Sequence, residues 1–335
     1  MTFSKDVLQL DPAVETERIV QALRQQVRKI LRRGGAVVGI SGGVDSAVVF
    51  ALCVRAFGPD KVDALILPDR DSSPDSEKLA RELAARFGVT PTLENITPAL
   101  EGFGCYRRRD EAVRRVLPEY DAAAGYRMKI VLPHSLLDQD TLNAFSVTIV
   151  RPDGVERTKP LPAREFMQIV ASSNLKQRSR MAMLYHYGEL HNHAVIGTAN
   201  KNEHDQGFFV KYGDSGADVQ AVAHLYKTQI YQLAEHLQVP EAIQLRTPTT
   251  DTYSAPCTQE EFFFRLPFEV MDLLWYAQEH QVPVPEVARV MGLTEVQVQR
   301  AFADFARKHR TTEYLRMGPV NLAATGAANP DRPGP

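Results

Sequence analysis

Residues 39–46 read Gly39-Ile40-Ser41-Gly42-Gly43-Val44-Asp45-Ser46. A short apolar run at 36–40 precedes this stretch and predicts a buried strand. An apolar segment at 44–57, stopped by Gly58-Pro59, predicts a helix directly after it. Small residues let backbone N–H groups approach a polyanion, and the helix N-terminus adds a partial positive charge. The order strand, glycine-rich turn, helix therefore indicates a phosphate-binding loop.

Segments of alternating type continue on both sides of this loop. The patterns predict helices at 11–30, 73–87, 162–191 and 226–237, and strands at 62–67, 90–96 and 193–197. Strands separated by helices pair in parallel through right-handed crossovers. The predicted fold is therefore α/β, a doubly wound, Rossmann-like parallel sheet.

The middle and the C-terminal part follow other patterns. Two extended runs, 143–150 and 155–160, flank the turn signal Pro152-Asp153-Gly154 and predict a β-hairpin. A helix rich in arginine is predicted at 106–116, before the hairpin. Residues 102–165 could therefore form a lid over the phosphates, or they could be a solvated surface insertion. We expect an α/β domain over 1–255, a helical extension over 256–316 with helices at 259–280 and 285–308, and a flexible tail over 317–335.

Composition excludes several classes of protein. The 335 residues carry a formal net charge of -2, which argues against a uniformly basic nucleic-acid binder. No apolar run reaches the length of a membrane span, and the first residues do not resemble a signal peptide. The three cysteines, Cys53, Cys105 and Cys257, are odd in number and far apart, which disfavours a disulfide framework. We expect a cytoplasmic protein.

The carboxylate within the loop carries the first chemical clue. Asp45 would repel phosphates unless a cation lies between them, and Mg²⁺ is the natural bridge. No Gly-Lys-Ser/Thr follows, so the loop is not a Walker motif, and it is not a Gly-x-Gly-x-x-Gly loop either. It resembles the Ser-Gly-Gly-x-Asp-Ser loop of the ATP pyrophosphatases, which cut ATP between its α and β phosphates. A glycine-rich turn without a ligand is the alternative interpretation. The resemblance implies ATP contacts at Gly39, Ile40, Ser41, Gly42, Gly43, Val44, Asp45 and Ser46.

A second block narrows the resemblance. It contains Asn174-Leu175-Lys176-Gln177-Arg178-Ser179-Arg180-Met181, Gly197-Thr198, Glu203, Gly207-Phe208-Phe209-Val210-Lys211-Tyr212-Gly213-Asp214, Asp218 and Lys227. Order and spacing resemble the NAD synthetase family over about residues 15–255. The resemblance implies ATP contacts at Thr198, Lys227 and Thr249, and a second Mg²⁺ ligand at Glu203 beside Asp45. It also implies contacts to the dinucleotide substrate at Arg178, Lys211, Asp218, His309 and Arg310.

The family resemblance further implies a two-step amidation of deamido-NAD. A carboxylate attacks the α-phosphate of ATP to give an acyl-adenylate and pyrophosphate, and ammonia then displaces AMP. The expected catalytic residues are Asp45, Lys227 and Asp214, the last accepting a proton from ammonium. The roughly 40 residues before the loop are too few for a glutaminase domain, so free ammonia is the implied donor. The family also implies a homodimer.

Other interpretations of these residues remain open. Singly, Glu203 and Lys211 could be solvated surface charges, and Lys176, Arg178 and Arg180 could form a basic helix face. His191, His193 and His204 could suggest zinc, but no cysteine or carboxylate has a matching spacing.

Two further segments leave the function itself open. Residues 286–302 resemble a helix-turn-helix, although their thin basic excess favours helix packing over DNA binding. Residues 251–261 depart from the family pattern, which leaves open a related ligase acting on another carboxylate. A nucleotide-binding sensor without catalysis is the third possibility, and the presence of both Asp45 and Glu203 argues against it.

Overall fold

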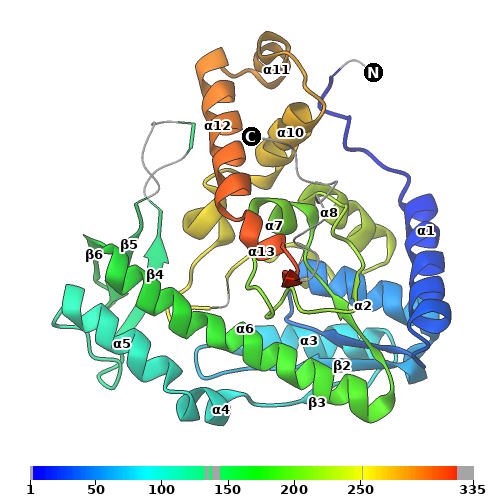
Figure 1. The fold of residues 1–335 in the computed structure, drawn as a ribbon, viewed down its shortest axis with the longest axis horizontal. Helices are drawn as coiled ribbons and strands as arrows, with labels where there is room; N and C mark the ends of the chain where they lie inside the picture. The colour runs from blue at the N-terminus through cyan, green and yellow to red at the C-terminus, as the bar shows by residue number, and fades with distance from the viewer. Residues whose placement is uncertain (1–2, 133–135, 138–143, 251, 323–335) are drawn as a thin grey trace.

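The computed structural model describes residues 3–132, 136–137, 144–250 and 252–322. Residue 143, where one strand was predicted to begin, and residues 323–335 of the predicted tail lie outside them. Figure 1 shows a central parallel sheet with helices against it, a small second sheet beside it and a group of helices at the top. None of the described helices combines the length and the apolar composition that crossing a bilayer requires.

The central sheet confirms the predicted doubly wound topology. Its five strands pair in parallel in the order β3-β2-β1-β7-β8. From β1 the chain moves outward to β2 and β3, and it returns on the other side of β1 as β7. The strand order therefore reverses between β1 and β7, where a crevice opens at the carboxyl ends of the strands. The strands are β1 (Ala36–Gly39), β2 (Val62–Ile66), β3 (Thr92–Leu93), β7 (Ala194–Gly197) and β8 (Val219–Gln220).

The helices around the sheet follow the predicted pattern closely. The helix α2 has the predicted bounds, and Asp11 caps α1 as its position before Pro12 indicates. The third strand is shorter than the predicted 90–96, because Pro91 has no N–H to donate to a ladder. These helices are α1 (Pro12–Arg24, continued by a π-helical turn Gln25–Ile30), α2 (Val44–Phe57), α3 (Pro74–Arg86), α6 (Ala163–His191), α7 (Lys201–Gln206), α8 (Lys227–His236) and α9 (Glu241–Gln244).

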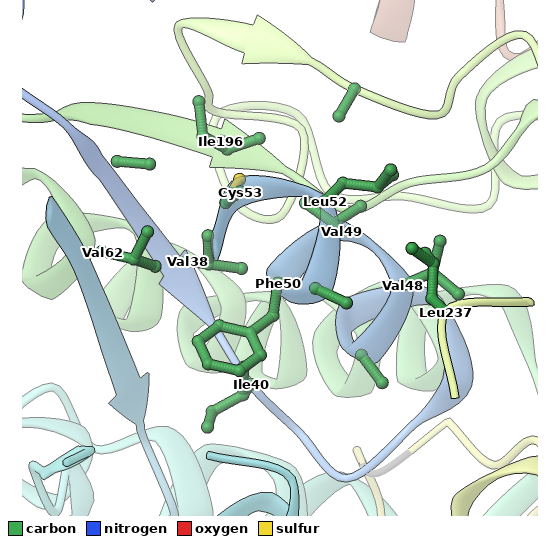
Figure 2. Close-up of a cluster of buried hydrophobic side chains, with 14 of the residues drawn as sticks. Val38, Ile40, Val48, Val49, Phe50, Leu52, Cys53, Val62, Ile196 and Leu237 are labelled. Carbon is green, nitrogen blue, oxygen red and sulfur yellow. The ribbon is translucent and has the colours of Figure 1, made fainter. Parts of the chain in front are cut away.

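Alternation along β1 divides the core into two layers. Val38 faces a cluster that also contains residues of α1, α2 and α8, whereas Val37 faces α6 and the start of α5. In Figure 2, Val38 and Ile40 lie beside Phe50 of α2, and Ile196 of β7 lies nearby. Both faces of the sheet are thus buried, as the uninterrupted apolar strands predict.

The predicted hairpin is present within a three-stranded antiparallel sheet. β5 (Ser146–Val150) pairs with β6 (Glu156–Pro160) and also with β4 (Arg127–Val131), which was not predicted. The inner side chains of this sheet pack on α6 and α5 (Cys105–Val116), which follows the short α4 (Thr97–Gly102). Because Val147 and Ile149 are fully buried there, the insertion has its own core and is not a solvated decoration.

The C-terminal helices differ from the prediction in their bounds. The predicted helix at 259–280 is a π-helical turn, Glu260–Phe264, followed by α10 (Phe268–Glu279), because Pro267 ends one helix and starts the next. Past α10, α11 (Val284–Met291) ends before Gly292, and α12 (Glu295–Thr311) and α13 (Glu313–Arg316) follow. Helices α11 and α12 bury Val287 and Val298 in one cluster with α10, which is helix–helix packing.

Candidate active site

The glycine-rich loop lies at the carboxyl end of β1, at the reversal of the strand order. Gly42 has a φ of +74°, and a Cβ there would lie 2.7 Å from the carbonyl oxygen of Ser76, so only glycine fits. The Ser46 hydroxyl donates to the Gly43 carbonyl at 3.0 Å and accepts from the Ser41 amide at 3.2 Å. Among the described residues, no side chain caps the N-terminus of α2 at Gly43. These amides are therefore held in a fixed turn from which they can reach an anion.

Asp45 meets residues that follow β7. One of its carboxylate oxygens accepts a hydrogen bond from Asn200 Nδ2 at 2.9 Å, and the other pairs with Lys227 Nζ. Asn200 is also the N-cap of α7, and its capping box fixes Glu203 at the third helical position. The chain after β7 therefore brings Asp45, Glu203 and Lys227 together, although they are far apart in the sequence.

This group does not hold enough positive charge to keep both of its carboxyl groups ionised near neutral pH. Burial, and after it the neighbouring Asp45 carboxylate, raise the pKa of Glu203 to about 8. Burial opposes the charge of Lys227, but Asp45 and Glu203 outweigh it and raise the pKa of that ammonium. One buried ammonium thus faces two carboxyl groups. When Glu203 loses its proton, the two carboxylates carry one negative charge that Lys227 does not compensate, and such oxygen donors fit the ligand preference of Mg²⁺.

A cavity of about 860 Å³ extends from the loop toward the C-terminal helices. Its walls include most of the residues predicted to contact ATP and substrate. They are Gly39, Ile40, Ser41, Gly43, Val44, Asp45, Ser46, Arg178, Thr198, Glu203, Lys211, Asp214, Lys227 and Thr249.

Four predicted site residues do not line this cavity in the described structure: Gly42, Asp218, His309 and Arg310. Gly42 shapes the turn from behind. Asp218 accepts hydrogen bonds from the Val195 amide at 2.8 Å and the Tyr185 hydroxyl at 3.1 Å. His309 contacts the Asp205 carbonyl oxygen through Nδ1 at 2.9 Å. Asp218 and His309 thus make contacts within the protein scaffold.

The loop after α7 carries Lys211 and Asp214. Lys211 Nζ donates to the carbonyl oxygens of Tyr314 and Met317, at 2.7 and 2.8 Å, and so ties the loop to the end of the described chain. Asp214 accepts a hydrogen bond from the Val210 amide at 2.7 Å. Its side chain meets the cavity, yet the surrounding protein atoms desolvate the carboxyl and raise its pKa to about 6. A carboxyl with this pKa is suited to accept a proton near neutral pH.

Three polar residues near the loop were missed by the sequence analysis. Asn200 could have been found, because an Asn three residues before a Glu at a strand end is a capping-box signal. Arg246 donates to the Gly42 carbonyl and to Ser76 Oγ, and Gln259 Nε2 donates to Glu203 Oε1 at 3.2 Å. Neither has a local signal, because only the tertiary fold brings 246 and 259 to the loop.

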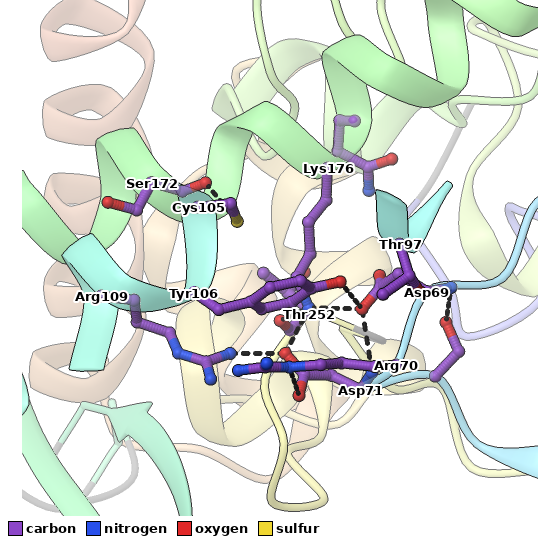
Figure 3. Close-up of polar contacts among 12 residues, drawn as sticks. Asp69, Arg70, Asp71, Thr97, Cys105, Tyr106, Arg109, Ser172, Lys176 and Thr252 are labelled. Carbon is purple, nitrogen blue, oxygen red and sulfur yellow. Dashed lines mark hydrogen bonds and ion pairs between the residues drawn. The ribbon is translucent and has the colours of Figure 1, made fainter. Parts of the chain in front are cut away.

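A second buried cluster of charges borders the cavity (Figure 3). Lys176 Nζ lies 3.0 Å from an Asp69 oxygen and 2.8 Å from an Asp71 oxygen, and Arg109 pairs with Asp71 and Asp110. Lys176 and Arg109 are each 1% exposed. The alternative of a basic helix face is therefore wrong for Lys176, which is buried, and for Arg180, which pairs with Asp69. Of these three residues, only Arg178 is exposed.

Burial alone would raise the pKa of the Asp71 carboxyl in this second cluster. The charges of Arg109 and Lys176 outweigh burial and lower it. We call Asp69, Arg70, Asp71, Arg109, Asp110, Lys176 and Arg180 the scaffold cluster.

Comparison with known proteins agrees with this architecture. A family model described as NAD synthase matches residues 15–143 and 152–316. The NH(3)-dependent NAD(+) synthetase of Mesorhizobium japonicum is 48% identical, over 94% of this chain and 98% of its own length. The protein of the same name from Rhizobium meliloti is 46% identical, over 95% and 94%.

Solved structures share the fold at lower identity. An NH3-dependent NAD synthetase from Campylobacter jejuni, in complex with the nitrate ion, superposes with a TM-score of 0.60 at 22% identity, covering 93% of this chain and all of that one. An NMN synthetase from Francisella tularensis gives 0.59 at 22%, covering 93% and 99%. Together, the family match and these close relatives show that the chain belongs to the NAD synthase family.

Proposed function

We propose that this chain is an ammonia-dependent NAD⁺ synthetase, which amidates deamido-NAD with ATP and releases AMP and pyrophosphate. The observation that carries this function is the meeting of Asp45, Glu203 and Lys227 beneath the phosphate loop. The names of the relatives at 44–48% identity support the same reaction.

When the substrate carboxylate is activated by ATP, pyrophosphate is the leaving group and negative charge develops on its oxygens. In the first step, an oxygen of the nicotinate carboxylate attacks the α-phosphorus, and the bond to the bridging oxygen breaks. The loop amides and Lys227 stabilise the pyrophosphate oxygens as that charge develops. Asp45 and Glu203 would hold Mg²⁺, which supplies Lewis-acid neutralisation of phosphate charge when bound.

Amidation requires neutral ammonia, because ammonium has no free electron pair with which to attack the acyl carbon. Ammonium is the main form at neutral pH, so a nearby base must take a proton before nitrogen attacks the acyl carbon and AMP departs. Asp214 lines the cavity and has a raised pKa, and it is the residue we assign to that proton. Arg178 and Lys211 on the same wall would hold the substrate's phosphates.

Location and assembly are further parts of the proposal. Cys53, Cys105 and Cys257 are all free thiols, which suits a reducing cytoplasm. The family resemblance favours a homodimer, for which light scattering should give twice the 37.4 kDa of one chain.

Product analysis tests the reaction itself. Purified protein is mixed with ATP, Mg²⁺, ammonium and deamido-NAD, and NAD and AMP are quantified together. We expect equal amounts of both products and none without ammonium. AMP formed only with another acid would assign a different substrate, and ATP binding without turnover of any acid would contradict catalysis.

A further inference from the structure

Three potential metal ligands meet at the amino ends of the inner strands, whereas the nucleotide cavity lies at their carboxyl ends. Asp63 is the second residue of β2, His191 is the last residue of α6, and His193 immediately precedes β7. Along the sequence, no cysteine or carboxylate has a spacing that would complete a zinc site with these histidines. The fold supplies that carboxylate from β2, and it leaves His204 elsewhere, paired with Asp205 in α7.

The three ligand atoms lie close together. His191 Nδ1 is 3.0 Å and His193 Nδ1 is 2.7 Å from the same oxygen of Asp63, and all three atoms lie within 4.8 Å of one another. Zinc binds nitrogen and oxygen at about 2.0–2.1 Å, so tetrahedral ligand atoms are separated by about 3.3 Å. The two distances to the Asp63 oxygen need to lengthen by only about 0.3 and 0.6 Å to reach this separation.

The space between these side chains depends on a glycine. Asp63 and His193 reach toward each other past the start of β1, which lies between β2 and β7 in the sheet. A Cβ on Gly35 would lie 2.7 Å from His193 Nε2 and 2.2 Å from the carbonyl oxygen of Lys61. Glycine at this position therefore leaves room for the imidazole ring.

The backbone around the two histidines is fixed before any ion binds. Asn192 ends α6 in a left-handed conformation, which turns the chain between His191 and His193. The Gly34 amide donates to the Asn192 carbonyl at 2.8 Å, and the Ala194 amide donates to the Gly35 carbonyl at 3.0 Å. The ligands thus come from three elements joined by hydrogen bonds, as a preorganised site requires.

We propose that Asp63, His191 and His193 form a site for a transition-metal dication such as Zn²⁺, with water as the fourth ligand. Two imidazole nitrogens favour Zn²⁺, Co²⁺ or Ni²⁺ over Mg²⁺ and Ca²⁺, which prefer oxygen. His193 is 9% exposed and His191 is 43% exposed, so one side of the site is closed and the other is open to an ion from solution. The ion would cross-link β2, α6 and β7, and none of its ligands lines the nucleotide cavity.

Cobalt titration of the full chain, freed of metal by a chelator, tests this site. Tetrahedral Co²⁺ with nitrogen ligands absorbs strongly in the visible range, whereas Co²⁺ bound by oxygens at Asp45 and Glu203 would absorb weakly. We expect one equivalent to give the strong band, and His191→Gln and His193→Gln to weaken this binding about 100-fold. His186→Gln, which removes an exposed histidine from the same helix, should leave the band unchanged.

Two further readouts separate this site from the proposed reaction. Zn²⁺ should raise the melting temperature of the wild type but not that of His191→Gln, whose exposed side chain can change without loss of fold. Turnover of deamido-NAD should stay unchanged in His191→Gln. The absence of the band in the wild type, or a band of full strength in both glutamine variants, would overturn the metal site and leave the proposed function untouched.

Discussion

The two buried groups of charges in this molecule differ in their balance. Beneath the phosphate loop, the ammonium of Lys227 faces the two carboxyl groups of Asp45 and Glu203. In the scaffold cluster, three aspartates meet Arg70, Arg109, Lys176 and Arg180. The carboxyl pKa values respond in opposite directions, since that of Glu203 is raised to about 8 and that of Asp71 is lowered.

The difference in charge balance indicates a structural role for the scaffold cluster and a functional role for the group beneath the phosphate loop. A compensated buried cluster satisfies its own charges and fixes the elements that it joins, here α5, α6 and the loop after β2. Beneath the phosphate loop, ionisation of Glu203 is unfavourable until a cation takes the place of its proton, and carboxyl groups with perturbed pKa values of that kind gather at functional sites. The comparison predicts that changes in the scaffold cluster affect stability, whereas changes at Asp45, Glu203 and Lys227 affect turnover.

Asp45→Asn should have the largest effect. The amide holds Mg²⁺ poorly and cannot pair with Lys227, so NAD formation should fall about 1000-fold. The fold should survive, because Glu203 can lose its proton and compensate the positive charge of Lys227 in place of Asp45. The measurement is NAD formation together with thermal unfolding. Asp75→Asn, at an exposed position in the first turn of α3, is the matched control. Turnover of Asp45→Asn within tenfold of the wild type would contradict the role of this carboxylate.

Asp71→Asn should mainly reduce stability. Removing one partner leaves Arg109 and Lys176 incompletely paired in a buried place, which costs about 3–5 kcal/mol. The pH dependence follows from the lowered pKa of Asp71. The stabilisation is complete above the usual aspartate pKa of 3.8 and is lost as pH falls through the lower pKa of the folded state. Urea unfolding at several pH values should show a constant difference from the wild type between pH 7 and about pH 4. Equal midpoints at pH 7 would show that the cluster contributes nothing.

Asp214→Asn should slow only the second half of the reaction. Without a carboxylate to accept the proton of ammonium, amidation should fall about 100-fold, while exchange of pyrophosphate into ATP continues. In the wild type, the amidation rate should fall as pH drops below about 6, where Asp214 becomes protonated, and the variant should lack that limb. Unchanged turnover with ammonium as donor would remove Asp214 from the mechanism.

Arg70→Ala should have the smallest effect. This side chain is 39% exposed, lies 3.7 Å from an Asp110 oxygen and covers the Tyr106 ring. Partly exposed pairs and cation–π contacts contribute about 1 kcal/mol or less. Chemical denaturation should therefore place this variant near the wild type. A loss as large as that of Asp71→Asn would mean that the rim of the cluster matters as much as its buried centre.

Local signals accounted for much of the fold. The bounds of α2 were predicted because Gly43 and Gly58 delimit one apolar helix, and both strands of the hairpin were predicted from its turn. The strand β4 was missed although Met128 and Ile130 alternate with the charged Arg127 and Lys129, a pattern of one buried face. The break at Pro267 was also missed, because apolar residues continue on both sides of it.

The candidate site was predictable where a motif existed. Asp45, Glu203 and Lys227 were named from the sequence and lie together in the cavity, although their roles stay predictions. Gln259 and Arg246 depend on distant contacts that no local pattern encodes. The carboxylate beside His191 and His193 escaped notice for the same reason, since Asp63 comes from another strand.

The dependence of ATP binding on Mg²⁺ tests the central claim most directly. Calorimetric titration of the wild type with ATP is carried out once with Mg²⁺ and once with a chelator. If Mg²⁺ compensates the negative charge of the Asp45 and Glu203 carboxylates, the ion should tighten ATP binding at least about tenfold, or roughly 1.4 kcal/mol. Equal affinity with and without the ion would contradict the account.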